Sequence, residues 1–211
     1  PLSCKNWTWC IGILEKMATR KNLKITFDSP VTLILVLFCF LSGILSKSIP
    51  ELQSFFSCPT CASGQNPFNF KSLSDYFKLI LYPLGFSDWN NLAKNLVFIL
   101  FLCPKVEQVF GKSILSLLIF VCVIFSGVVC VCFSNFSMVG TSGIVCLLLI
   151  LLLYSSFDKK ELPFSYILLA LIYFSSEIFS IFSSNSLVIF CHFAGALVGS
   201  LVGILSLNSK R

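Results

Sequence analysis

Charged residues are scarce in this chain of 211 residues: they make up 11% of it, whereas hydrophobic residues make up 56%. A soluble domain of this length could not cover its surface with so few charges, which excludes an ordinary soluble protein. The composition therefore predicts an integral membrane protein, with the lipid bilayer as its solvent. The formal net charge of +6 does not indicate a nucleic-acid partner, because basic residues in membrane proteins mostly mark the cytoplasmic side.

Histidine is almost absent, since His192 is the only one, whereas cysteine occurs eleven times. Most of the cysteines lie inside apolar runs, where a free thiol behaves as a small apolar residue. Cys58 and Cys61 form a C-x-x-C pair in a polar loop, with no histidine or second pair nearby. This is a weak zinc signal, and a local disulfide or two ordinary thiols are both better interpretations. We expect no metal and no cofactor.

Long hydrophobic runs are abundant. A membrane helix needs about 20 mostly apolar residues to cross the hydrocarbon core, and six runs approach or reach this length, with Pro30 opening the first. These runs cover residues 31–45, 89–103, 114–133, 142–157, 163–179 and 187–207. No repeat or low-complexity tract divides them. The predicted fold class is an all-α polytopic membrane protein, with one six-transmembrane-helix domain over residues 28–208 between tails at 1–27 and 209–211.

The basic residues set the expected orientation. With the N-terminus in the cytoplasm, only four of the fifteen basic residues lie outside or near the outer surface, namely Lys47, Lys71, Lys78 and Lys94. This positive-inside bias predicts cytoplasmic N- and C-termini. The compact six-helix form makes a bacterial inner membrane the default location for the multi-pass chain, with an organelle membrane as the alternative. Residues 46–88 then form an outside loop apolar enough to rest in the membrane interface. Residues 1–16 are either a misplaced start before Met17 or an ordinary short tail.

Polar side chains inside membrane helices are costly, so each of them needs an explanation. The second run contains Asn91 and Asn95, the fourth begins at Ser142, and the sixth contains His192. On the expected topology these three helices all run from outside to inside. The four polar residues therefore arrive near the same outer leaflet at comparable depth.

A hydroxyl, an imidazole and side-chain amides are the groups that acyl transfer requires. Histidine, with a reference pKa of about 6.5, suits the general base that a serine nucleophile needs. Asn91 and Asn95, together with the backbone N–H groups at the helix start around Ser142, could stabilise an oxyanion. Each feature alone has a structural explanation, such as hydrogen bonding between helices. Their common sidedness favours the functional interpretation.

Small residues complete this pattern. His192, Gly195 and Gly199 share one helix face, and glycines let another helix backbone approach closely. Gly143, next to Ser142, suits the same purpose. We therefore expect contact between the fourth and sixth helices to bring Ser142 within hydrogen-bonding reach of His192.

Three sequence blocks resemble the rhomboid family of intramembrane serine proteases. GTSGIV, which begins at Gly140, is similar to the serine motif of the family, and HFAGALVG, which begins at His192, to its histidine motif. NLAKNLVFILFLCPKVEQVFG, over residues 91–111, is similar to the second-helix block, with Glu107 and Gly111 at its cytoplasmic end. The resemblance implies that Ser142 is the nucleophile and His192 the general base. It also implies that Asn95 stabilises the oxyanion.

The chain departs from the family pattern at three places. Asn91 stands where the family usually has a second histidine, so we expect altered rather than absent oxyanion stabilisation. Cys146 stands where many members have an aromatic ring stacked on the catalytic histidine, and a thiol cannot stack in the same way. The Trp-Arg pair common in the first loop has only a loose substitute, over residues 76–78.

The resulting hypothesis is an intramembrane serine endopeptidase that cleaves in or next to transmembrane helices of single-span or polytopic membrane proteins. By family analogy, the fifth helix, near Glu177, is the expected lateral gate. The alternative is a non-catalytic relative, a pseudoprotease or chaperone that binds transmembrane segments, to which Asn91 and Cys146 are the hints. A small-solute transporter is a third class, weakened because membrane-embedded charge is scarce, with Lys94 as its main candidate.

Overall fold

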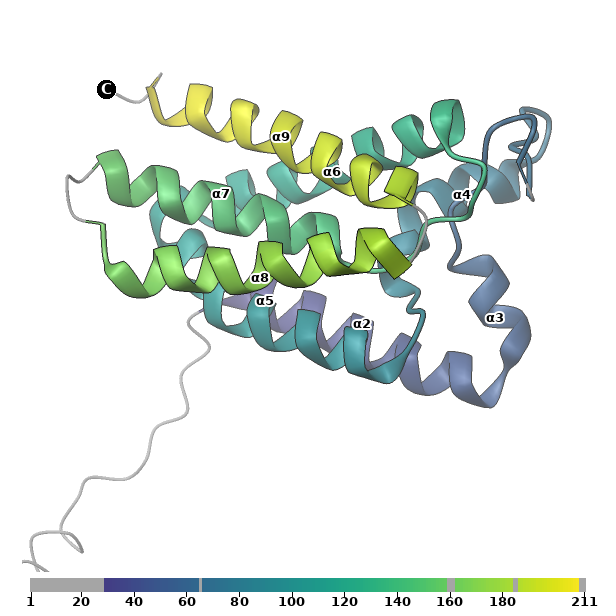
Figure 1. Ribbon diagram of the computed structural model, residues 1–211, viewed down its shortest axis with the longest axis horizontal. Helices are drawn as coiled ribbons and strands as arrows, with labels where there is room; N and C mark the ends of the chain where they lie inside the picture. The colour runs from purple at the N-terminus through teal and green to yellow at the C-terminus, as the bar shows by residue number, and fades with distance from the viewer. Residues whose placement is uncertain (1–28, 65, 159–161, 184–185, 209–211) are drawn as a thin grey trace, which may run out of the picture.

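Helices make up most of the computed structural model, which describes residues 29–64, 66–158, 162–183 and 186–208. The predicted tails at 1–27 and 209–211, together with Met17, lie outside the described residues. Within them, six helices of 17 to 23 residues form the bundle (Figure 1). They are α2 (Pro30–Ser48), α5 (Trp89–Phe110), α6 (Lys112–Phe133), α7 (Ser142–Asp158), α8 (Phe164–Ser183) and α9 (Ser186–Asn208). The predicted all-α class is confirmed.

The helices differ in how clearly they qualify as membrane spans. Among the described residues, α2 and α6 are long and apolar enough to cross a membrane by length and composition. Shorter apolar segments occupy α7, α8 and α9, at Ser142–Phe157, Phe164–Ile178 and Ile189–Leu205. The six-span arrangement and the orientation of the termini therefore stay predictions.

α5 extends past the predicted end at Cys103 and contains Pro104 in its interior. An interior proline removes one helical hydrogen bond and crowds the preceding turn, but the turns that follow are anchored by Glu107. Its carboxylate accepts the backbone N–H groups of Val31 and Thr32, both at 3.2 Å, and the Thr32 hydroxyl at 3.1 Å. These bonds satisfy donors at the start of α2, so the contact between the two helices outweighs the local effect of the proline.

α9 packs most extensively against α6 and then against α7. A Cβ atom at Gly195 would overlap the Ser126 hydroxyl and lie 2.5 Å from the Cys122 carbonyl oxygen, both on α6. At Gly199 it would lie 3.2 Å from the Cys122 Cβ and 2.9 Å from Leu147 of α7. The glycine face of α9 therefore contacts two helices, and Gly195 contacts α6 rather than the expected fourth helix, α7.

The long loop between α2 and α5 contains three short helices, α3 (Pro50–Phe55), α4 (Leu73–Leu81) and η1 (Tyr82–Leu84). This loop is bound to the segment that precedes α7. The Cys58 N–H donates to the Met138 carbonyl at 2.9 Å, and the Gly140 N–H donates to the Tyr82 carbonyl at 3.1 Å. The loop therefore reaches the immediate approach to Ser142.

Candidate active site

Ser142 is the first residue of α7 and is buried. The chain enters the helix through Gly140, whose φ of +99° lies in the left-handed region that glycine adopts at no steric cost. The Val145 N–H donates to the Thr141 carbonyl at 3.1 Å, across the first turn of the helix. The N–H groups of Ser142 and the next two residues precede this bond, so they lack intrahelical acceptors.

The starts of α5, α7 and α9 lie at the same end of the bundle, where α7 and α9 meet at His192 (Figure 1). A Cβ atom at Gly143 would lie 3.1 Å from His192 Nδ1 and 3.4 Å from the His192 carbonyl oxygen. The structure therefore brings Ser142 and His192 together on adjacent helices. Within the described part of the chain, the Ser142 hydroxyl does not hydrogen-bond to the imidazole, and His192 Nδ1 has no partner.

The aromatic ring beside His192 belongs to Tyr82 of η1. The two ring centroids are 6.3 Å apart and the rings are tilted by 44°. Burial raises the pKa of the Tyr82 hydroxyl well above its ordinary value, so this group is neutral; it donates to the Val123 carbonyl at 3.4 Å. Because the Tyr82 carbonyl also accepts the Gly140 N–H, this one residue contacts both the turn before Ser142 and the histidine.

A second tyrosine, Tyr173 of α8, covers the other side of the site. Its hydroxyl donates to the Ser142 carbonyl oxygen at 3.1 Å. The Ser142 carbonyl belongs to the helical turn that ends at Cys146, so this bond places Tyr173 beside Cys146. An aromatic side chain from a different helix therefore lies against the position where the family pattern places a ring.

The two predicted asparagines have different surroundings. Asn95 is 2% exposed, and its Oδ1 has no hydrogen-bond partner in the described residues. Asn91 is half-buried; its backbone N–H donates to Asp88 Oδ1 at 2.7 Å, and its side-chain amide donates to Ser87 Oγ at 3.4 Å. The structure thus leaves the Asn95 side chain with an unpaired acceptor inside the bundle, whereas the Asn91 side chain binds the loop that precedes its own helix.

The contact between α5 and α8, which we call the α5–α8 seam, is made by the ends of side chains. Three pairs follow one another along the two antiparallel helices. They are Lys94 and Glu177, with a 3.1 Å ion pair, Phe98 and Tyr173, with ring centroids 5.0 Å apart, and Lys105 and Tyr166, with a 3.0 Å hydrogen bond. Lys94 Nζ also lies 5.5 Å from the Tyr173 ring centroid. The seam therefore lies directly beside the Tyr173 contact with Ser142.

The two thiols of the C-x-x-C pair have separate partners. The Cys58 thiol donates to the Gly127 carbonyl at 3.8 Å, and the Cys61 thiol donates to Asn135 Oδ1 at 2.9 Å. Both are free cysteines. No group of three or more potential metal ligands is found in the portion that the structure describes.

Sequence reasoning singled out Ser142, His192 and the two asparagines but missed both tyrosines. Tyr82 belongs to a loop and Tyr173 to an apolar helix, and neither carried a sequence signal beyond its aromatic ring. In a comparison with protein-family models, the rhomboid domain matches residues 73–209, from the start of α4 through α9. No curated protein matches the chain.

Proposed function

The chain belongs to the rhomboid family, and we propose that it is an intramembrane serine endopeptidase with Ser142 as nucleophile and His192 as general base. One observation carries this proposal. Gly143 packs so closely on His192 that a Cβ would lie 3.1 Å from the ring nitrogen. This contact keeps the hydroxyl-bearing start of α7 next to the imidazole of α9.

The chemistry requires no group beyond these side chains and water. Ser142 Oγ attacks the carbonyl carbon of the scissile peptide bond while His192 accepts the hydroxyl proton. His192 then gives this proton to the amine nitrogen as the C–N bond breaks, which leaves the acyl group on Ser142. A water molecule that donates its proton to His192 hydrolyses the ester and restores the serine.

The oxyanion needs hydrogen-bond donors that are in place before the reaction. The unpaired N–H groups of Ser142 and Gly143 supply some of them, and the buried amide of Asn95 supplies another. Removing one such donor typically lowers the rate by about 10²–10³. Because the Asn91 amide is bound to Ser87, we assign Asn91 the smaller contribution.

The proposed setting is a bacterial inner membrane crossed by all six long helices, with both termini in the cytoplasm and Ser142 near the outer leaflet. Substrates are transmembrane segments of single-span or polytopic proteins. A regular helix hides its carbonyl groups, so the substrate unwinds locally before Ser142 attacks. It enters through the α5–α8 seam near Glu177, where contacts between side-chain ends can separate without backbone overlap.

The test is cleavage of a single-span reporter by the reconstituted protein. Ser142→Ala is compared with Ser155→Ala, because Ser155 is an equally buried serine near the other end of α7. We expect the wild type and Ser155→Ala to cleave the reporter and to be labelled by a fluorophosphonate, and Ser142→Ala to do neither.

The alternative, a pseudoprotease that binds transmembrane segments, predicts a different result. In that case no variant cleaves any of several reporters and the probe does not label Ser142, yet a photo-crosslinkable transmembrane peptide still binds. That combination would refute the proposed peptidase.

A further inference from the structure

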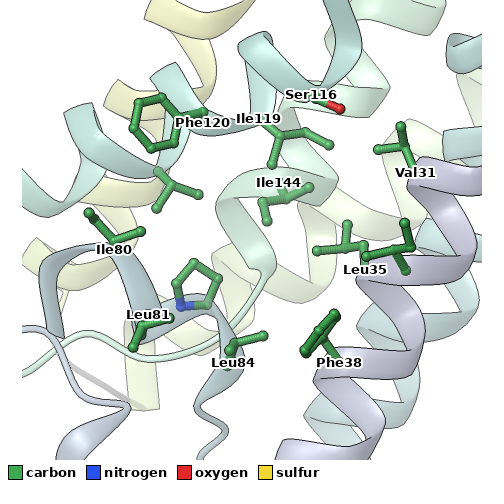
Figure 2. A pocket seen from close by; sticks show the side chains of 13 residues that line it. Val31, Leu35, Phe38, Ile80, Leu81, Leu84, Ser116, Ile119, Phe120 and Ile144 are labelled. Atoms are coloured by element: carbon green, nitrogen blue, oxygen red, sulfur yellow. The ribbon is translucent and has the colours of Figure 1, made fainter. Parts of the chain in front are cut away.

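An apolar groove lies on the side of the bundle between α2, η1 and α6, with a volume of about 370 Å³ (Figure 2). This is within the range of about 300–1,000 Å³ that is typical of ligand pockets. Ser116 is the one polar residue in its lining, and its hydroxyl already donates to the Lys112 carbonyl at 2.9 Å. The groove therefore selects an occupant without polar groups.

The groove opens towards the surface of the bundle. Ile34 and Phe38 of α2 are each 57% exposed, and Phe120 of α6, on the opposite wall, is 51% exposed. Val123 and Ile144 at its base are 5% and 3% exposed. Figure 2 shows Ile144 between the side chains of α2 and those of α6. In a membrane protein an opening in such an apolar surface faces lipid chains.

A cation lies close to one end of the groove. Lys112 begins α6 one helical turn before Ser116; it is exposed and makes no ion pair among the residues that the structure describes. At 1.5 Å per residue, α6 rises about 16 Å from Lys112 to Val123. A positive charge followed by an apolar channel matches the order of groups in an anionic phospholipid, a charged headgroup followed by an acyl chain.

We propose that this groove binds one acyl chain of an anionic phospholipid, whose headgroup is held by Lys112. The bound acyl chain packs against residues that are close in sequence to those of the candidate active site. Leu81 and Pro83, which line the groove, flank Tyr82, whose ring faces His192. Ile144 lies two residues after Ser142 on α7. Only this consequence for the site rests on the proposed function; lipid binding itself does not.

The experiment uses the full chain in nanodiscs that contain phosphatidylglycerol with a diazirine near the end of one acyl chain. Mass spectrometry after illumination maps the cross-linked residues. Ile34→Trp is compared with Leu37→Trp, because both residues lie on α2 and are 57% and 56% exposed, but only Ile34 lines the groove. We expect cross-links at Val123 and Ile144 in the wild type and in Leu37→Trp. They should fall about tenfold in Ile34→Trp, since an indole fills the space.

The headgroup is tested in the same system with Lys112→Gln and, as control, Lys71→Gln, which removes an exposed lysine from the loop after α3. Cross-links at the groove base should fall several-fold in Lys112→Gln, or with a phosphatidylcholine probe, and stay unchanged in Lys71→Gln. Cross-links spread evenly around the bundle, or equal labelling by both lipids, would overturn the proposal. Neither readout requires proteolysis, so a failed peptidase proposal would leave this result interpretable.

Discussion

Two helix–helix contacts in this bundle differ in type. They are the α6–α9 interface and the α5–α8 seam. At Gly195 a backbone lies against a backbone, with space for no Cβ atom beside Ser126 and the Cys122 carbonyl. Along the seam the contacts are those of long side chains, such as the 3.1 Å ion pair of Lys94 and Glu177. The first interface holds His192; the second borders Ser142 through Tyr173.

This difference shows which part of the molecule can move. Lipid chains are as apolar as the helices, so association depends on close packing and on hydrogen bonds between helices. Two closely packed backbones fit in a single relative position of the helices, and their contacts are lost entirely when the helices separate. Side-chain pairs can exchange partners as α8 moves, and the seam therefore suits an entrance, whereas the α6–α9 interface suits the support of a catalytic pair.

The largest effect on stability should come from a substitution that disrupts the α6–α9 interface. Gly195→Val places side-chain atoms on the Cys122 carbonyl, and we expect a loss of about 3 kcal/mol or more in unfolding free energy, together with activity. In the control Gly203→Ala, the nearest atoms are the side-chain ends of Leu151 and Leu118, at 2.7 and 3.1 Å, and the cost should be about 1 kcal/mol. Unfolding in detergent micelles measures both. Equal losses would show that α9 can shift away from α6.

A smaller effect on stability is expected from substitution of Tyr82. Its hydroxyl donates to the Val123 carbonyl of α6, and its own carbonyl accepts the N–H of Gly140 in the turn before Ser142. Tyr82→Leu removes the ring beside His192, and we expect kcat to fall by about 10–100-fold with little change in KM, because small misplacements of reacting groups have effects of this size. Tyr82→Phe keeps the ring and should retain most activity. Kinetics on the single-span reporter separate kcat from KM.

The control for Tyr82 is Phe110→Leu, which removes another ring that is 2% exposed, at the end of α5. It should lower stability by about as much as Tyr82→Leu and leave kcat unchanged. A similar fall of kcat in both variants would mean that Tyr82 acts only through general stability.

The sequence was sufficient to predict the six long helices, although not the end of α5, and to predict that Ser142 and His192 lie close together. Alternating helix direction put Ser142 and His192 at the same end of the bundle, and small residues such as Gly143 indicated that their helices touch. These inferences need only chain order, helix period and side-chain size. The roles of Ser142 and His192 in catalysis stay predictions until activity is measured.

Other features depend on three-dimensional packing that no local pattern encodes. Tyr82 reaches His192 because a long loop folds back onto the start of α7. α5 continues past Pro104 because Glu107 binds the start of α2, which is distant in sequence. Gly195 faces α6 because of the rotation of α9 about its own axis, and glycine spacing defines a face without naming its partner.

The smallest effect on stability, and the one that best separates the two interfaces, should come from the α5–α8 seam. The double variant Lys94→Leu/Glu177→Gln removes the ion pair without leaving an unpaired buried carboxylate, so we expect a loss of about 1 kcal/mol or less. Cleavage of the reporter should nevertheless become several-fold faster, because α8 separates from α5 more readily beside Ser142. Lys105→Leu is the control, since it breaks the 3.0 Å bond to Tyr166 at the other end of the seam and should leave the rate unchanged. Unchanged cleavage by the double variant would mean that substrate does not enter between α5 and α8.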